Sequence, residues 1–132
     1  MKIIITGGAG FIGGHVVRHV LNQGHTVCTV DVMTYAASPS LIQEFNHHPN
    51  HRFEKINICD GTAIANLFTN FQPDAIMHLA AESHVDRSIS GPGVFIQTNI
   101  VGTYTLLESA RGYYQSLSPD RQKTFRFHHI ST

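Results

Sequence analysis

Charged side chains are scarce in this sequence, and neither sign is in excess. They make up 14% of the 132 residues, and nine Lys and Arg balance nine Asp and Glu. A balanced charge creates no field that attracts a phosphate polymer, so nucleic acid is not an expected partner. The apolar fraction of 42% is ordinary for a globular protein. At this length it predicts one domain with its own core.

Cysteine and long apolar runs are also rare. Cys28 and Cys59 lie far apart, without the close pairing that zinc ribbons and dithiol redox sites need. We expect both to be buried, reduced thiols. No basic segment leads into a long apolar stretch, so the sequence predicts neither a signal peptide nor a membrane span. A cytosolic protein is expected.

Histidine is abundant, with ten residues, but its spacing does not predict a metal site. His15 and His19 have metal-ligand spacing on a helix, yet no acid or third ligand accompanies them, so we interpret them as solvated. The histidines within residues 47–51 surround a Pro-Asn pair, which is typical of an exposed loop. For His78 and His84 we expect local packing. No metal is predicted.

Apolar runs rich in β-branched residues recur along the chain. They predict strands at residues 3–5, 26–30, 53–58, 75–79 and 125–130, of which the third run is the weakest. Between the first two, residues 11–23 form a helical pattern that ends before Gly24. The apolar face of this pattern consists of Ile12, Val16, Val17, Val20 and Leu21.

Further helix signals follow. Pro39 and Pro92 occupy plausible first helical positions, and Asp60 or Thr62 could cap a helix that ends near Phe71. Strands that alternate with helices indicate a parallel sheet covered on both faces. The sequence therefore predicts an α/β fold, a Rossmann-like doubly wound sheet of five strands in the order 3-2-1-4-5.

Residues 6–13, Thr-Gly-Gly-Ala-Gly-Phe-Ile-Gly, join the first expected strand to the first helix. In a pyrophosphate site Gly7 allows the tight turn, Gly10 lets the main chain approach the ligand, and Gly13 lets helix and strand pack closely. The helix N-terminus adds free N–H groups and a positive dipole end. Asp31 follows the second strand at roughly the 20-residue spacing where an acid binds the adenosine ribose. The pattern predicts a dinucleotide site.

The identity of the dinucleotide is also indicated. Asp31 repels a 2′-phosphate, and Val32 and Met33 follow it in place of an Arg that would neutralise one, so NAD is favoured over NADP. A triphosphatase loop would need Gly-Lys-Ser/Thr, but residues 13–15 are Gly-Gly-His. The alternative is that the loop is only a tight turn and Asp31 a solvated acid at a strand end.

A third feature is the segment at residues 79–88, which reads Leu-Ala-Ala-Glu-Ser-His-Val-Asp-Arg-Ser. Together with the glycine loop and Asp31, this segment closely resembles the dTDP-glucose 4,6-dehydratases of the extended short-chain dehydrogenase/reductase family. Residues 31–36, 98–103 and 128–132 resemble further blocks of these enzymes, so the resemblance covers the whole chain. It implies NAD as the cofactor and dTDP-glucose as the substrate. The implied product is the 4-keto-6-deoxy sugar of deoxysugar biosynthesis.

The resemblance also implies site residues. Those matched to NAD contacts are Phe11, Ile12, Asp31, Val32, Met33, Thr34, Ile58, Leu79, Ala80, Ala81, Glu82, Ser83 and Thr98. Ser83 and Thr132 match positions that touch the sugar, and Thr132 is assigned to the catalytic site. Asn57 stands where the family usually has an Asp that binds the adenine amine, and its amide oxygen can still accept that bond.

The family's chemistry requires a Tyr with a Lys four residues on, because the Lys lowers the phenol pKa. None of Tyr35, Tyr104, Tyr113 and Tyr114 has such a Lys. In the family this pair, and an acid pair for the elimination, come after the block matched by residues 128–132. The resemblance thus makes residues 1–132 a truncated, NAD-binding Rossmann domain without the substrate domain, which we expect to be inactive alone.

Two alternatives stay open beside this interpretation. The chain could be an NAD-binding or docking module without catalysis, or a poorly folded remnant whose strand edge at 125–130 aggregates. The helix expected after Pro92 bears on the first of these. Its broad apolar surface of Phe95, Ile96, Ile100, Val101, Tyr104 and Leu107 is either core or, as in the family, a face that packs against a second subunit of a homodimer.

Overall fold

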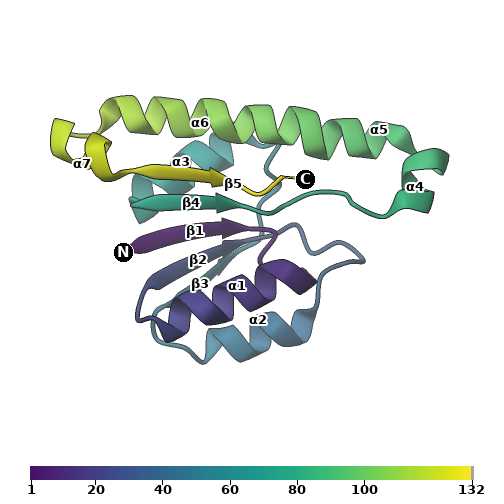
Figure 1. The fold of residues 1–132 in the computed structure, drawn as a ribbon, viewed down its shortest axis with the longest axis horizontal. Coiled ribbons are helices and arrows are strands. Elements are labelled where there is room, and N and C mark those ends of the chain that lie inside the picture. Colours follow the sequence, from purple (N-terminus) through teal and green to yellow (C-terminus); the bar gives the residue numbers. More distant parts are fainter. Residues whose placement is uncertain (132) are drawn as a thin grey trace.

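A computed structural model describes residues 1–131 of the chain. The five strands are β1 (Lys2–Thr6), β2 (Thr26–Val30), β3 (His51–Glu54), β4 (Ala75–His78) and β5 (Arg126–His129). All pairs are parallel, and the order across the sheet is β3-β2-β1-β4-β5 (Figure 1). The predicted fold class and strand order are confirmed.

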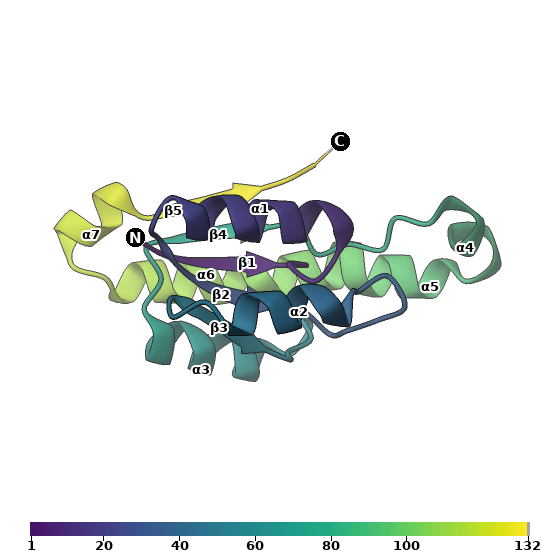
Figure 2. The same ribbon diagram turned by 90° about the horizontal axis from the view of Figure 1, so that it is seen from below.

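Helices cover both faces of this sheet. On one face lie α1 (Phe11–Asn22) and α2 (Pro39–Asn46), and on the other lie α3 (Gly61–Phe71) and α6 (Thr103–Ser116) (Figures 1 and 2). Successive side chains of β1 point to opposite faces of the sheet, so they pack against both helix layers. Ile3 and Ile5 pack in the core under α1 and α2, whereas Ile4 packs in the core under α3 and α6. Because both faces are buried, the three central residues of β1 are all apolar.

The remaining helices lie toward the ends of the sheet. After β4 the chain forms α4 (Val85–Ser90), α5 (Pro92–Phe95) and the π-helical segment η1 (Ile96–Gly102), which continues into α6. In Figure 1 residues 92–116 form one long rod above the sheet. Helix α7 (Pro119–Thr124) leads into β5. The rod carries η1 to the carboxyl ends of the strands.

The sequence signals predicted for helix starts and ends are confirmed at four positions. Pro39 and Pro92 each lie in the first turn of a helix. Asp60 is the N-cap of α3, and its carboxylate accepts the N–H of Ala63 at 3.0 Å. Helix α1 ends at Asn22, and Gly24 has a φ of +81°, which glycine adopts readily.

Four expectations, for the third strand, one cysteine and two histidines, were wrong. The third strand spans 51–54 and not 53–58, because the register pairs Val30, the last residue of β2, with Glu54. His51 therefore lies in a strand and not in an exposed loop, and its Nε2 is 2.9 Å from the Thr29 hydroxyl. Cys59 is only half-buried, and its thiol donates to the Gln97 carbonyl. His84, for which we expected local packing, is instead an exposed residue at the N-cap of α4.

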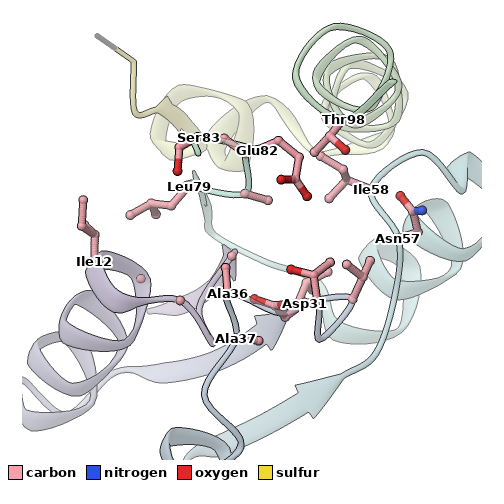
Figure 3. A pocket seen from close by; sticks show the side chains of 18 of the residues that line it. Ile12, Asp31, Ala36, Ala37, Asn57, Ile58, Leu79, Glu82, Ser83 and Thr98 are labelled. Carbon is pink, nitrogen blue, oxygen red and sulfur yellow. The ribbon is translucent and has the colours of Figure 1, made fainter. Parts of the chain in front are cut away.

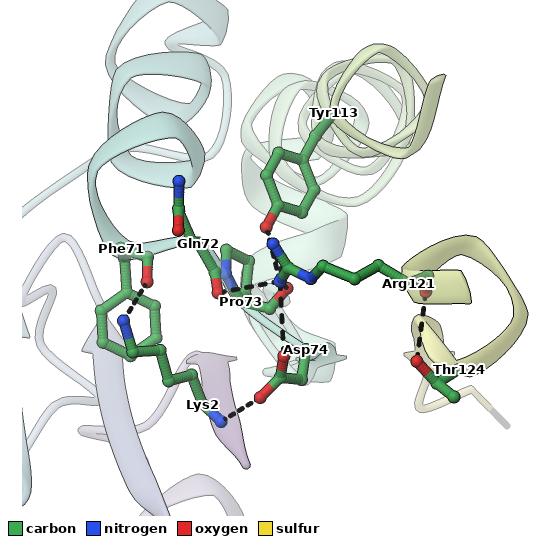
Figure 4. Close-up of polar contacts among 8 residues, drawn as sticks. All are labelled: Lys2, Phe71, Gln72, Pro73, Asp74, Tyr113, Arg121 and Thr124. Carbon is green, nitrogen blue, oxygen red and sulfur yellow. Dashed lines mark hydrogen bonds and ion pairs between the residues drawn. The ribbon is translucent and has the colours of Figure 1, made fainter. Parts of the chain in front are cut away.

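At the amino ends of the strands, an arginine hydrogen-bonds to the segment before β4 and to helix α6. Arg121 in α7 donates to the carbonyls of Gln72 and Pro73, to the Asp74 carboxylate and to the Tyr113 hydroxyl (Figure 4). The Asp74 carboxylate also accepts the main-chain N–H of Lys2 at 2.7 Å. Since Asp74 directly precedes β4, this cluster joins β1, β4 and the helices α6 and α7.

No helix within residues 1–131 combines the length and the apolar character needed to cross a membrane.

Candidate dinucleotide site

The carboxyl ends of the strands carry an open pocket of about 720 Å³. Its walls are the β1–α1 loop, the segments after β2 and β3, the loop after β4 and residues 93–98 of the rod (Figure 3). Strand order reverses between β1 and β4, and ligands of doubly wound sheets bind at such a point. A pocket of this volume is large enough for a cofactor.

Most of the residues predicted for the site come together in this pocket. Lining it are Gly7, Gly10, Phe11, Ile12, Gly13, Asp31, Val32, Thr34, Asn57, Ile58, Leu79, Ala80, Ala81, Glu82, Ser83 and Thr98. Met33 is not among them, because its φ of +60° turns the chain and its side chain packs against the core under α1 and α2. Thr132 lies outside the described residues.

Several lining residues were not predicted. They are Val30, Ala36, Ala37, Ile56, Gly93, Val94, Gln97 and Ile130. Ile56 comes from the segment wrongly assigned to the third strand, and its position follows from where β3 ends. Val94 and Gln97 reach the pocket only because the rod crosses the strand ends. No local sequence pattern encodes that crossing.

The β1–α1 loop packs closely against the loop after β4 at Gly7 and against helix α1 at Gly13. Gly7 has a φ of +71°, and a Cβ there would lie 2.7 Å from the main-chain nitrogen of Ala80. A Cβ on Gly13 would lie 2.0 Å from the Gly7 carbonyl oxygen. The tight-turn role of Gly7 is confirmed. Gly13 brings α1 close to the β1–α1 loop and not to the strand itself, and the approach of a ligand to Gly10 stays a prediction.

The N-terminus of α1 opens into the pocket. No side chain of residues 1–131 caps this end, and the first N–H groups of a helix have no partner within the helix. Phe11 and Ile12 are 81% and 66% exposed in this first turn. The expectation that Ile12 joins the buried face of α1 was wrong, because its side chain projects into the pocket (Figure 3). The free amides and dipole of this turn suit an anionic group.

Asp31 stands at the end of β2 with its carboxylate fixed by main-chain groups. Its Oδ2 accepts the N–H of Ala9 at 3.1 Å, and its Oδ1 accepts the N–H of Met33 at 2.8 Å. Each oxygen retains a lone pair for a hydroxyl donor. Among the described residues that line the pocket, the only charged side chains are Asp31 and Glu82. Asp31 would therefore repel a 2′-phosphate on the ribose, which is the group that distinguishes NADP from NAD.

Behind the pocket, a buried network fixes the loop that follows β4. The Thr6 hydroxyl accepts the N–H groups of Leu79 and Ala80, each at 3.2 Å. Its own hydrogen is then directed to His78 Nδ1 at 2.7 Å, which leaves Nε2 to donate to Thr103 at 2.9 Å. The imidazole is thus neutral. Burial, and secondarily the nearby His129, lower the pKa of His78 to about 4.

Asn57 lies on the far side of the pocket from Ile12 (Figure 3). Its Oδ1 accepts the N–H of Cys59 at 2.9 Å, which fixes the amide and leaves a second lone pair on the oxygen. The predicted bond to an adenine amine stays a prediction.

No group of three His, Cys, Asp or Glu within residues 1–131 is arranged to hold a metal ion.

Comparisons with known proteins agree with this geometry. Two curated relatives are dTDP-glucose 4,6-dehydratases, from Escherichia coli (60% identity) and Haemophilus influenzae (56%). Each match covers the whole chain but only 37% and 39% of the relative. The chain thus spans less than half the length of the curated relatives it matches.

Solved structures give the same result. The dTDP-glucose 4,6-dehydratase of Streptomyces venezuelae, with NAD and TYD bound, is 41% identical over 86% of this chain and 36% of its own, with a TM-score of 0.80. The Bacillus anthracis enzyme, in complex with NAD, is 30% identical over the whole chain and 37% of its own, also with a TM-score of 0.80. The sequence profile of the family described as GDP-mannose 4,6 dehydratase matches residues 4–132. The chain therefore belongs to the GDP-mannose 4,6-dehydratase family.

Proposed function

We propose that this chain is the NAD-binding domain of a dTDP-glucose 4,6-dehydratase. The observation that carries the proposal is the pocket, in which an uncapped helix N-terminus, a tightly packed glycine loop and the fixed carboxylate of Asp31 surround one cavity. These groups fit the diphosphate and ribose of a dinucleotide. The family and the 60% identical relative favour this activity and this substrate.

Each end of the pocket has a role in this proposal. The amides of the first turn of α1 bind the diphosphate, Asp31 accepts hydrogen bonds from the adenosine ribose, and Asn57 accepts one from the adenine amine. At the other end Ser83 contacts the sugar. Thr132, which lies outside the described residues, is proposed as a second contact to the sugar. The chemistry that bound NAD supplies in this family is the acceptance of a hydride from sugar C4 and its return to C6, with water eliminated across C5 and C6 in between.

Titration calorimetry with NAD and NADP tests the cofactor assignment. We expect residues 1–132 to bind NAD, and Asp31→Asn to weaken that binding by about tenfold, since a hydrogen bond to a charged acceptor is removed. Asp31→Asn should also reduce the preference for NAD over NADP. Asp120→Asn is the matched control, because Asp120 is 94% exposed in α7, outside the pocket. Absence of NAD binding in a folded sample would refute the proposal.

The rod gives a second proposal, self-association of two copies. Its outer face exposes Ile96 (54%), Ile100 (64%), Tyr104 (64%) and Leu107 (45%). Of the six apolar residues identified on this helix, none belongs to the two buried cores. A row of exposed apolar side chains on one helix is typical of a subunit interface. A second copy packed face to face on the rod would bury it in a homodimer.

A further inference from the structure

Two loops on opposite sides of the pocket are joined by a side-chain contact. Tyr35, in the loop after β2, donates its hydroxyl hydrogen to Glu82 Oε2 at 3.1 Å. Glu82 lies in the loop after β4 and lines the pocket, and in Figure 3 its carboxylate points toward the side that carries Asp31. The bond therefore connects the two rims, and its partners are 47 residues apart in the sequence.

Glu82 is also held from the rod. Asn99 in η1 accepts the main-chain N–H of Glu82 at 2.8 Å and donates its amide hydrogen to the Glu82 carbonyl at 2.9 Å. Such a paired contact fixes both the position and the orientation of the residue. Glu82 thus gives Tyr35 a fixed anchor on the far rim.

Arg87 lies over the ring of the tyrosine. Its guanidinium carbon lies 3.6 Å from the centre of the Tyr35 ring, within the range of a cation–π contact. Desolvation of the phenol, followed by its hydrogen bond to Glu82, raises the pKa of Tyr35, so the hydroxyl stays a donor. Tyr35 remains 52% exposed, which places this group at the surface and not in the floor of the pocket. We refer to Tyr35, Glu82 and Arg87 as the clasp.

We propose that the clasp closes over a bound dinucleotide and limits the rate at which it leaves. The inference rests on the proposed function, because it requires that the pocket hold NAD. A ligand that reaches from Asn57 to Ile12 lies between the two rims that the clasp joins. The Tyr35–Glu82 bond crosses one route from the pocket to solvent, so release by that route requires the bond to open. An enzyme whose cofactor first accepts a hydride from the sugar and later returns it gains from such retention, because the reduced cofactor must stay until the second transfer.

The release rate of NADH tests this proposal. The chain contains no Trp, so the fluorescence of the reduced nicotinamide is observed without indole background. Bound NADH is chased with excess NAD in a stopped-flow instrument. For Tyr35→Phe, which keeps the ring under Arg87 but removes the donor, we expect release to accelerate about fivefold with little change in the association rate. For Arg87→Leu we expect an acceleration of about threefold.

Tyr114→Phe is the matched control, because Tyr114 is a partly exposed tyrosine on α6 outside the pocket. Circular dichroism establishes that each variant is folded. Unchanged or slower release from both clasp variants, in a protein that binds NADH, would overturn the clasp and leave the proposed function intact. Faster association with unchanged release would overturn it too, since the contact would then obstruct entry. Failure of the unsubstituted chain to bind NADH refutes the proposed function itself.

Discussion

His78 lies behind the pocket with both ring nitrogens hydrogen-bonded and 1% of its surface exposed. Because burial lowers its pKa from 6.5 to about 4, the unfolded chain binds a proton more readily than the folded chain between these values. The free energy of unfolding is therefore expected to be constant above about pH 6.5 and to decrease as the pH falls toward 4. The expected loss from His78 is about 3 kcal/mol at most. Urea unfolding measured at pH 7.5 and at pH 4.5 checks it.

His51 contributes with the same sign. Desolvation, and to a lesser extent His48, lower the pKa of His51 to about 4, and its Nδ1 is buried without a partner among the described residues. His78→Asn and His51→Asn should each remove part of the pH dependence, and the double variant most of it. A double variant that loses as much stability between the two pH values as the parent would show that other groups carry the effect.

Some roles of single residues could be predicted from the sequence and others could not. Gly7, Gly13 and Asp31 were placed correctly because the spacing of the glycine motif encodes local geometry. Tyr35 and Arg87 received no role, since their contacts join loops that only the folded sheet brings together. The resemblance placed Ile12 in the pocket correctly. The helical period assigned it wrongly to the buried face, because that period does not reveal that the first turn of α1 extends beyond the strands it packs on.

The junction of β1 and α1 depends on the lack of a side chain at Gly13. In Gly13→Ala the new methyl group would lie 2.0 Å from the Gly7 carbonyl oxygen, so loop and helix must separate. We expect a loss of about 2–3 kcal/mol in the free energy of unfolding and loss of NAD binding. Gly112→Ala is the control, because no atom lies within 4 Å of the position that its methyl group would take and Ala stabilises a helix by about 0.5–1 kcal/mol. Chemical unfolding and calorimetry with NAD distinguish the two.

Helix α7 is attached to the sheet mainly through Arg121. Arg121→Met removes the donor to two carbonyls, a carboxylate and the Tyr113 hydroxyl, and we expect it to lower the free energy of unfolding by about 1–3 kcal/mol. Arg111→Met is a matched control, because its partner Glu108 lies on the same exposed helix face and such a pair contributes about 0.3–0.5 kcal/mol. Equal losses in the two variants would contradict the role given to Arg121.

The elements themselves were predicted well where the local signal was strong. The ends of α1, α2 and α3 follow from Gly24, Pro39 and Asp60, whose conformational and capping preferences act within one turn. The bounds of β3 did not follow from its sequence, because a strand extends only as far as its neighbour offers partners. β2 ends at Val30, and the chain after Glu54 turns away and lines the pocket.

Assembly of two molecules through the rod can be tested by sedimentation velocity. Ile100→Glu places a carboxylate in the centre of the exposed apolar face, and we expect it to weaken self-association by about tenfold or more, since the charge would have to be buried in the interface. Ile89→Glu is the control, because Ile89 is 79% exposed but lies on α4, outside the rod. A monomeric parent chain, or a dimer that tolerates Ile100→Glu, would contradict an interface on this face.

The position of β1 in the sheet has a consequence for biogenesis. β1 is synthesised before the other four described strands, yet it lies third across the sheet and needs neighbours on both sides. One neighbour, β2, follows after a short helical connection. The pairing of β1 with β4, in contrast, joins residues 72 positions apart in the sequence. A nascent chain must therefore shield the three consecutive isoleucines of an unpaired β1 until more than half of residues 1–132 have been made. Ordering of the glycine loop against Ala80 comes late in that sequence of events, so cofactor capture follows completion of the central strands.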